Sequence, residues 1–200
     1  EYSLRSGRAH TFIFRGDYAA VVSQFEEAVP AGEGPRAVAS ATRFRAVAGT
    51  ALMELGELER AGALLDEALA VAERSGVSAF ILVTVLNALG GLAHYRGDSA
   101  ACVEWHRRAL RLLEADGHRR MQAPHYCNLA GATMDLGRLD EARDAFERAV
   151  SIAATFGDHG PLAFSLAGLA NTSLRLGDLA SAEKSAARAR AAALQIGSVS

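Results

Sequence analysis

Aromatic residues, prolines and cysteines are all scarce in this sequence, and each scarcity excludes a class of protein. Aromatics make up 6% of the 200 residues, so a core has to be built mainly from alanine, leucine and valine. With only four prolines and abundant alanine the chain favours helices, because alanine has the highest helix propensity and proline the lowest. The two cysteines, Cys102 and Cys127, lack metal-ligand spacing and cannot make a disulfide framework, which fits a reducing cytoplasm.

An excess of positive charge is also missing. The chain has 21 basic and 23 acidic residues, which gives a formal net charge of −2. Proteins that bind nucleic acid directly usually concentrate lysines and arginines on one face, so we expect no such binding here. The compact basic cluster His118-Arg119-Arg120 is either a solvated surface segment or a phosphate site.

One long uncharged run raises the question of a membrane segment. Ser75 to Tyr95 contains no charged residue and is long enough to span a bilayer. It also contains Asn87 and His94, and a helix packed between neighbours is apolar all round as well. We therefore expect a buried helix and no membrane span. The chain starts without a methionine and without a visible signal peptide, so we expect it to be a piece of a longer protein.

What the sequence does contain is a glycine that recurs with a nearly fixed period. Five marker glycines follow one another at intervals of 40, 41, 40 and 40 residues: Gly16, Gly56, Gly97, Gly137 and Gly177. In four copies a second glycine comes 20 residues later, at Gly76, Gly117, Gly157 and Gly197. Such self-similarity at a fixed period is typical of repeat architectures.

Small residues recur in phase with the marker glycines. The position seven residues before each is Ala9, Gly49, Gly90, Ala130 and Ala170, and the position twelve after is alanine in every copy. Small side chains let two helices approach closely, and glycine ends a helix because it accepts the left-handed conformation. Acidic residues after four of the markers suit the amino end of the next helix.

Each repeat therefore predicts two antiparallel helices. The expected first helices are 2–15, 38–54, 78–95, 120–135 and 161–175, and the second helices are 17–30, 57–74, 98–115, 138–155 and 178–195. The fold class is all-α, with five helix-turn-helix repeats and about ten helices. We expect one solenoid domain over 1–200, with repeats at about 1–34, 35–76, 77–117, 118–157 and 158–197.

Over its whole length the sequence resembles the tetratricopeptide repeat family. The resemblance is carried by these segments: Arg15-Gly16-Asp17-Tyr18 with Phe25 and Ala28, Leu89-Gly90 with Arg96-Gly97-Asp98, and Leu136-Gly137-Arg138-Leu139-Asp140-Glu141-Ala142 with Phe146 and Ala149. The repeat is 40 residues long where the family's common repeat has 34, and the usual tryptophan and closing proline are missing. Longer repeats of this kind look like those of kinesin light chain and of bacterial regulators with helical sensor domains.

The resemblance implies a right-handed αα-superhelix and a non-catalytic module that binds a protein or peptide. In such solenoids the first helices line a concave groove. Counting from the marker glycines, we expect the groove to be lined at thirteen, ten, six and three residues before each. The predicted groove residues are His10, Arg43, Thr50, Met53, Asn87, His94, Asn128, Met134 and Asn171.

The asparagines among these residues have two possible roles. Their amides could hydrogen-bond the backbone of an extended peptide, since each offers donors and an acceptor, or they could tie neighbouring helices together. The methionines, Met53 and Met134, are either adaptable apolar contacts or core filling. No lysine lies on a predicted first helix, so we expect no preference for acidic carboxyl-terminal tails.

We expect no enzymatic activity, cofactor or metal site. The six histidines are scattered without metal-binding spacing, and no glycine forms a phosphate loop. His106 falls in a helix-packing column and is expected to be a core histidine.

The leading interpretation is a cytoplasmic scaffold that binds a polypeptide. Two alternatives remain open: a ligand-sensing or peptide-sensing segment of a larger transcription or signalling regulator, and a self-association module that forms a homodimer. The alanine-rich last helix without an extra capping helix favours the second alternative, since solenoid ends normally need polar caps.

Overall fold

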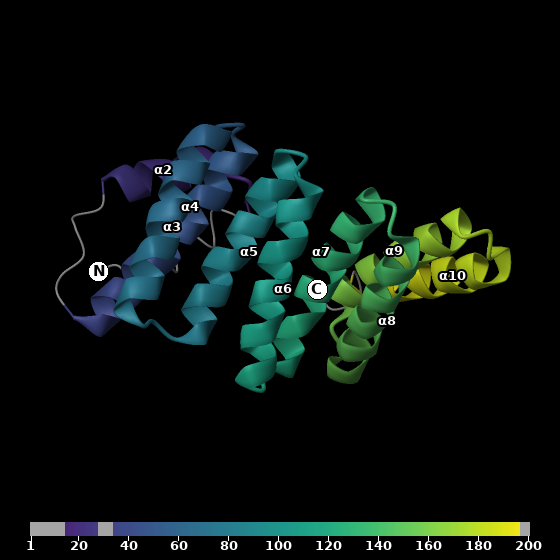
Figure 1. The fold of residues 1–200 in the computed structure, drawn as a ribbon. Helices are drawn as coiled ribbons and strands as arrows, with labels where there is room; N and C mark the ends of the chain where they lie inside the picture. The colour runs from purple at the N-terminus through teal and green to yellow at the C-terminus, as the bar shows by residue number, and fades with distance from the viewer. Residues whose placement is uncertain (1–14, 28–33, 197–200) are drawn as a thin grey trace. The chain divides into compact units, whose positions relative to one another are not determined.

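The structure is a computed structural model that describes residues 15–27 and 34–196 (Figure 1). Within these ranges the chain is helical apart from short connections and contains no strand. The chain divides into two compact units, Glu1–Asp98 and Ser99–Ser200, which we describe separately.

The described part of the first unit contains four helices. They are α2 (Tyr18–Glu26), α3 (Pro35–Glu54), α4 (Leu58–Ser75) and α5 (Ala79–Tyr95). The helices α3 to α5 begin and end within three residues of the expected bounds, and α2 covers the first part of the range expected for it. The helix expected at 2–15 lies outside the described residues. Pro35 begins α3, where its missing N–H removes no helical hydrogen bond.

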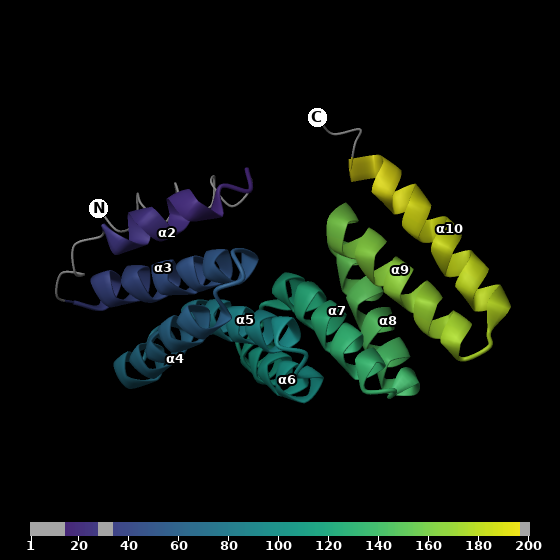
Figure 2. The ribbon, with the colours of Figure 1, turned by 90° about the horizontal axis from the view of Figure 1, so that it is seen from above.

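The second unit is described up to residue 196 and contains five helices. They are α6 (Ser99–Ala115), α7 (Arg119–Asp135), α8 (Leu139–Phe156), α9 (His159–Arg175) and α10 (Leu179–Ile196). All five agree with the expected ranges to within two residues at each end. Figure 2 shows α9 lying between α8 and α10, and it packs against both. The all-α repeat of paired antiparallel helices is thus confirmed.

The repeating glycines end the helices as expected. Gly137 has a φ of 75° and Gly157 a φ of 67°, a left-handed conformation that costs glycine little. After α7, the N–H of Gly137 donates to the carbonyl of Met134 (3.0 Å), and the N–H of Arg138 donates to that of Thr133 (3.0 Å). This pair of bonds is the Schellman motif, which satisfies carbonyls at the helix end.

The acidic residues after the marker glycines begin the next helices in two different ways. The Asp17 carboxylate accepts from the N–H of Ala20 (3.2 Å), and that of Asp178 accepts from the N–H of Ser181 (3.0 Å). These are N-caps, and the hydrogen bonds lower the pKa of Asp178. Glu57 makes no such cap and pairs with Arg60.

The small-residue columns are where the helices meet most closely. The alanines twelve residues after the markers, Ala68, Ala109 and Ala149, are fully buried. At Gly49 an added Cβ would lie 2.7 Å from Leu65 Cδ2, so α3 and α4 pack with no room for a side chain there. Close-packed interiors leave few voids, so these positions fix the distance between neighbouring helices.

The uncharged run between Ser75 and Tyr95 is a packed helix. In α5 the side chains of Ile81, Val83 and Leu86 are buried, and the helix packs against α3 and α4. Among the residues that the structure describes, no helix has the length and apolarity needed to cross a membrane.

Gly168→Ala should lower the free energy of unfolding. The added methyl group would run into the ring of Phe146, which is 2% exposed and cannot easily move aside. Overpacking costs about 1–3 kcal/mol, and the better helix propensity of alanine offsets about 0.5–1 kcal/mol of it. Urea denaturation measures the difference.

Gly131→Ala is the matched control. Gly131 lies inside α7, and a Cβ there would meet nothing within 4 Å. This variant should be more stable than the parent by about 0.5–1 kcal/mol. A gain of stability in both variants would contradict the close approach of α8 and α9 at Gly168.

Candidate functional site

The first helices of successive repeats pack directly against one another. In the first unit α3 packs on α5, and in the second α7 packs on α9. Among the described residues no comparable packing joins α6 to α8 or α8 to α10. The first helices therefore form a continuous wall within each unit, while the second helices are spaced apart behind it.

Specific contacts fix the packing of α7 on α9. The Oγ of Ser165 lies 3.3 Å from the Sγ of Cys127, and both side chains are buried. The hydroxyl of Thr172 lies 3.5 Å from the Sδ of Met134, and Arg175 donates to the Met134 carbonyl at 3.1 Å. Cys127 and Met134, which stand ten and three residues before the marker Gly137, are thus covered by α9, the first helix of the next repeat.

The same arrangement corrects the expectation for Met53. This residue is 4% exposed, and its Cε would lie 3.5 Å from a Cβ built at Gly91 of α5. Its side chain fills the interface between α3 and α5 and does not line an accessible surface. Met134, in the corresponding position of α7, is half-buried for the same reason. Both methionines thus act as filling between first helices.

The open residues of α3 and α5 form what we call the α3–α5 face: Arg43, Thr50, Glu54, Asn87, His94 and Tyr95. Asn87, His94 and Tyr95 are exposed, whereas Arg43 and Thr50 are half-buried. The Thr50 hydroxyl donates to the Ala46 carbonyl within its own helix, at 3.1 Å. Asn87 and His94 are seven residues apart, so they project from the same side of α5.

A hydrogen bond joins the two helices at the end of this face. The Tyr95 hydroxyl donates to Oε1 of Glu54 at 2.7 Å, which raises the pKa of Tyr95 to about 12. The His94 ring meets the Tyr95 ring edge-on, with 6.4 Å between the centroids. Tyr95 is not among the predicted groove residues, although it lies one residue after the predicted groove position His94.

The open residues of the second unit form the α7–α9 face, which we define by Pro124, Asn128, Phe164, Asn171 and Leu174. All five are exposed, with Phe164 at 67% and Leu174 at 57%. Phe164 and Leu174 lie in groove columns but are not among the predicted groove residues. An apolar residue in such a column can belong either to the groove or to the core, and the sequence alone does not tell which. The face combines two amides with two large apolar side chains.

The three asparagines are exposed and do not tie helices together. Within the described part of the chain, no side-chain hydrogen bond involves Asn87, Asn128 or Asn171. Their amides are therefore available to a ligand, two of them on the same face. The remaining predicted groove residue, His10, lies outside the described residues.

Two buried histidines face each other between α6 and α7. The Nδ1 atoms of His106 and His125 are 3.1 Å apart, and the residues are 1% and 4% exposed. One Nδ1 must carry a proton and donate while the other accepts, which requires the accepting ring to be neutral. Burial, together with the neighbouring imidazole, lowers the pKa of His106 to about 3, and burial lowers that of His125 to about 4.

The potential nucleophile Cys127 is not activated. Burial raises the pKa of its thiol, and a thiolate is the nucleophilic form. In the described residues no three histidine, cysteine or acidic side chains gather in a way that could hold a metal ion.

Comparison with known proteins finds a family match for part of the chain. Residues 121–195 match the family model described as Tetratricopeptide repeat. A comparison with curated proteins finds no match. The similar solved structures include kinesin light chain-like repeats from Podosopora anserina, at 19% identity over 98% of this chain and 95% of that one, with a TM-score of 0.73.

In two further solved structures the match covers only part of a longer chain. A signal-transduction ATPase with a tetratricopeptide repeat sensor from Pyrococcus horikoshii is 16% identical, over 98% of this chain and 30% of that one, with a TM-score of 0.84. PlcR from Bacillus thuringiensis, solved with a peptide and DNA, is 13% identical over 99% of this chain and 72% of that one, with a TM-score of 0.78. At these identities the likeness shows the fold alone.

Acidification should destabilise the protein through the buried histidine pair. The unfolded chain takes up protons near pH 6.5, whereas the folded pair does so only near pH 4 and below. The unfolding free energy therefore falls as the pH drops from 6.5, by about 2 kcal/mol per histidine at pH 5. Urea denaturation between pH 7 and pH 5 measures the slope.

His106→Gln should make this slope shallower, because it removes one titrating group while keeping a hydrogen-bonding side chain. His94→Gln, which changes an exposed ring outside the pair, serves as the control and should keep the parent slope. An equal slope in all three proteins would exclude the pair as the cause.

Proposed function

We propose that this chain, a tetratricopeptide-type helical repeat protein, binds an extended segment of another polypeptide on the open faces of its first helices and catalyses no reaction. Stacked helical repeats provide extended surfaces that suit such a ligand. The fold is generally non-catalytic, and its repeat neighbours include a regulator solved with a peptide.

The observation that carries the proposal is the composition of the α7–α9 face. Asn128 and Asn171 are exposed amides without an intramolecular hydrogen bond in the described residues. An extended peptide offers one N–H and one carbonyl per residue, and an asparagine amide can satisfy both kinds of group. Phe164 and Leu174 beside them supply apolar area for peptide side chains.

The absence of net charge on this face indicates the kind of peptide. Its five defining residues, Pro124, Asn128, Phe164, Asn171 and Leu174, are not ionisable, and the exposed charges at its end, Asp135 of α7 and Arg175 of α9, are of opposite sign. Recognition would therefore depend on backbone hydrogen bonds and apolar contact, with little dependence on salt. We propose a peptide with apolar side chains at alternate positions, since these project to one side of an extended strand.

Peptides selected from a random library by the whole chain should lose affinity for the double variant Asn128→Ala/Asn171→Ala. A hydrogen bond contributes about 0.5–1.5 kcal/mol, so the loss of two should weaken binding roughly five- to one-hundred-fold. Fluorescence anisotropy of a labelled selected peptide measures the dissociation constant.

Glu147→Ala is the control for this experiment, because Glu147 is exposed on the second helix α8 and away from the face. It should bind the peptide as tightly as the parent does. Thermal unfolding of all three proteins shows whether the alanine variants remain folded. Equal affinity of the folded double variant and the parent would refute the proposal.

A second proposed role is that of a sensing segment within a larger regulator. It is supported by the likeness to the repeat sensor of a signal-transduction ATPase, of which the matching part is 30% of the chain. A natural chain that continues into a nucleotide-binding or DNA-binding domain would favour this role. The binding face and the peptide chemistry would be the same in both cases.

Self-association is a third proposed role, supported by exposed apolar residues on the last two helices. Leu194 of α10 is 70% exposed and Leu179 is 63% exposed, in addition to Phe164 and Leu174 of α9. Sedimentation at micromolar concentration gives the mass in solution. A dimer would support this role, and a monomer would exclude it.

A further inference from the structure

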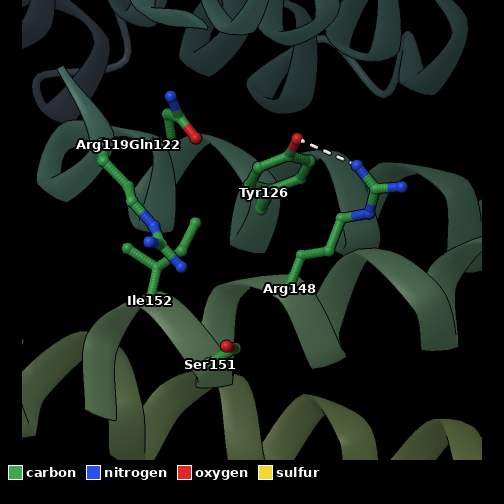
Figure 3. Close-up of a pocket in the computed structure, with 6 residues that line it drawn as sticks. All are labelled: Arg119, Gln122, Tyr126, Arg148, Ser151 and Ile152. Atoms are coloured by element: carbon green, nitrogen blue, oxygen red, sulfur yellow. Dashed lines mark hydrogen bonds between the residues drawn. The ribbon is translucent and has the colours of Figure 1, made fainter. Parts of the chain in front are cut away.

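A hollow between α7 and α8 carries two arginines on opposite walls. Its volume is about 240 Å³, and it is lined by Arg119, Gln122 and Tyr126 from α7 and by Arg148, Ser151 and Ile152 from α8 (Figure 3). None of these six side chains is acidic. The hollow is separate from the α7–α9 face, because its walls are a first helix and the second helix of the same repeat.

A chain of hydrogen bonds holds one of the arginines in place. The Tyr126 hydroxyl donates to Oε1 of Glu114 at 2.9 Å and accepts from Nη1 of Arg148 at 3.2 Å, as the dashed line in Figure 3 shows. The Arg148 guanidinium also lies over the Tyr126 ring, 5.6 Å from its centroid. These contacts occupy one edge of the guanidinium and orient the remaining N–H groups.

The side chain of the other arginine, Arg119, has no partner within the described residues, in contrast to that of the adjacent Arg120. Arg120 forms an ion pair with Asp158, in which its Nε donates to Oδ2 at 2.9 Å. The side chain of its neighbour Arg119 makes no hydrogen bond or ion pair in the described residues, and Figure 3 shows it extending toward Ile152 of α8. The basic cluster of the sequence is thus divided into a paired arginine and an unpaired one that opens onto the hollow.

The electrostatic balance of the hollow favours an anion. Arg119 is also the first residue of α7, where the helix dipole places partial positive charge. Two neighbouring acidic residues do not line the hollow: Glu114 accepts a hydrogen bond from Tyr126, and Asp144 lies one turn before Arg148 on α8. Gln122 and Ser151 add an amide and a hydroxyl, both of which can donate to an oxyanion.

The next repeat contains an equivalent hollow with different chemistry. It has a volume of about 310 Å³ and is lined by His159, Leu162 and Leu166 of α9 and by residues of α10 that include Arg188. His159 stands 40 residues after Arg119, Leu162 after Gln122, and Leu166 after Tyr126. The repeat produces the cavity in both places, but the α7–α8 copy has two guanidinium groups, whereas the α9–α10 copy has one and is lined by more aliphatic side chains.

We propose that the α7–α8 hollow binds a phosphate monoester carried by a serine or threonine side chain of a partner polypeptide. Arginine recognises phosphate through paired N–H groups, and two guanidinium groups on opposite walls can neutralise a dianion. The cavity is larger than one phosphate group, which leaves room for the side chain that carries it. The proposal does not depend on peptide binding at the α7–α9 face.

Titration of the whole chain with a capped phosphoserine tripeptide tests the proposal. Nitrogen-15 NMR should show the largest shifts at the amides of the first turn of α7 and smaller ones at the equivalent turn of α9. Loss of one charge-assisted contact should weaken binding about ten-fold in Arg119→Gln and in Arg148→Gln. Arg190→Gln, an exposed arginine of α10 that lines neither hollow, should leave the affinity unchanged.

Three comparison probes decide between the possible sources of the anion. The serine tripeptide should not bind, the glutamate tripeptide should bind more weakly than phosphoserine, and inorganic phosphate should cause shifts in the same amides. Equal binding of glutamate and phosphoserine would refute the preference for phosphate. Binding of inorganic phosphate without binding of the phosphoserine tripeptide would refute a peptide-borne group.

Equal affinity of Arg119→Gln, Arg148→Gln and Arg190→Gln for the phosphoserine tripeptide would overturn the site itself. The variant Asn128→Ala/Asn171→Ala should keep the parent affinity for this probe. Failure of peptide selection at the α7–α9 face and failure of phosphate binding at the hollow are therefore separate results.

Discussion

The close approach of helix backbones at small-residue positions is the constraint from which the other features follow. Gly49 lies against Leu65 and Gly168 against Phe146, each with no space for even a methyl group. The buried alanines Ala68 and Ala149 have the same function on the second helices. A larger residue at Gly49 would push α3 away from α4, and one at Gly168 would push α9 away from α8, because Leu65 and Phe146 already occupy the space.

Contact between first helices sorts their residues into covered and open ones. In α7, Cys127 and Met134 are covered by α9, whereas Pro124 and Asn128 remain open. Because of the helical periodicity the two sets of residues are adjacent in sequence. Neighbouring residues such as Cys127 and Asn128 therefore differ, the first filling the interface between helices and the second lying on the open surface. The proposed peptide face consists of the residues that this packing leaves uncovered, which explains its mixture of amides and apolar side chains.

Within the described residues, ion pairs join many of the exposed charges on neighbouring helices. Arg60 pairs with Glu26, Arg96 with Glu59, and Arg120 with Asp158. Such exposed pairs contribute little to stability, typically less than about 1 kcal/mol each. They matter here because they distinguish charges already satisfied within the protein from Arg119, whose guanidinium faces a hollow with Arg148 on the other wall.

The sequence by itself determined the helix pairs and their ends. Glycines such as Gly137 must adopt a positive φ, and alanines such as Ala149 must be buried, so both leave a period that can be read without coordinates. Tertiary structure alone decided which residues of a first helix are accessible. Met53 and Asn87 both lie in predicted groove columns, yet one is buried and the other exposed, because the helix that covers Met53 belongs to a different repeat. The pairing of His106 with His125 and the position of Arg119 opposite Arg148 also join residues of different helices, and a linear pattern does not encode that proximity.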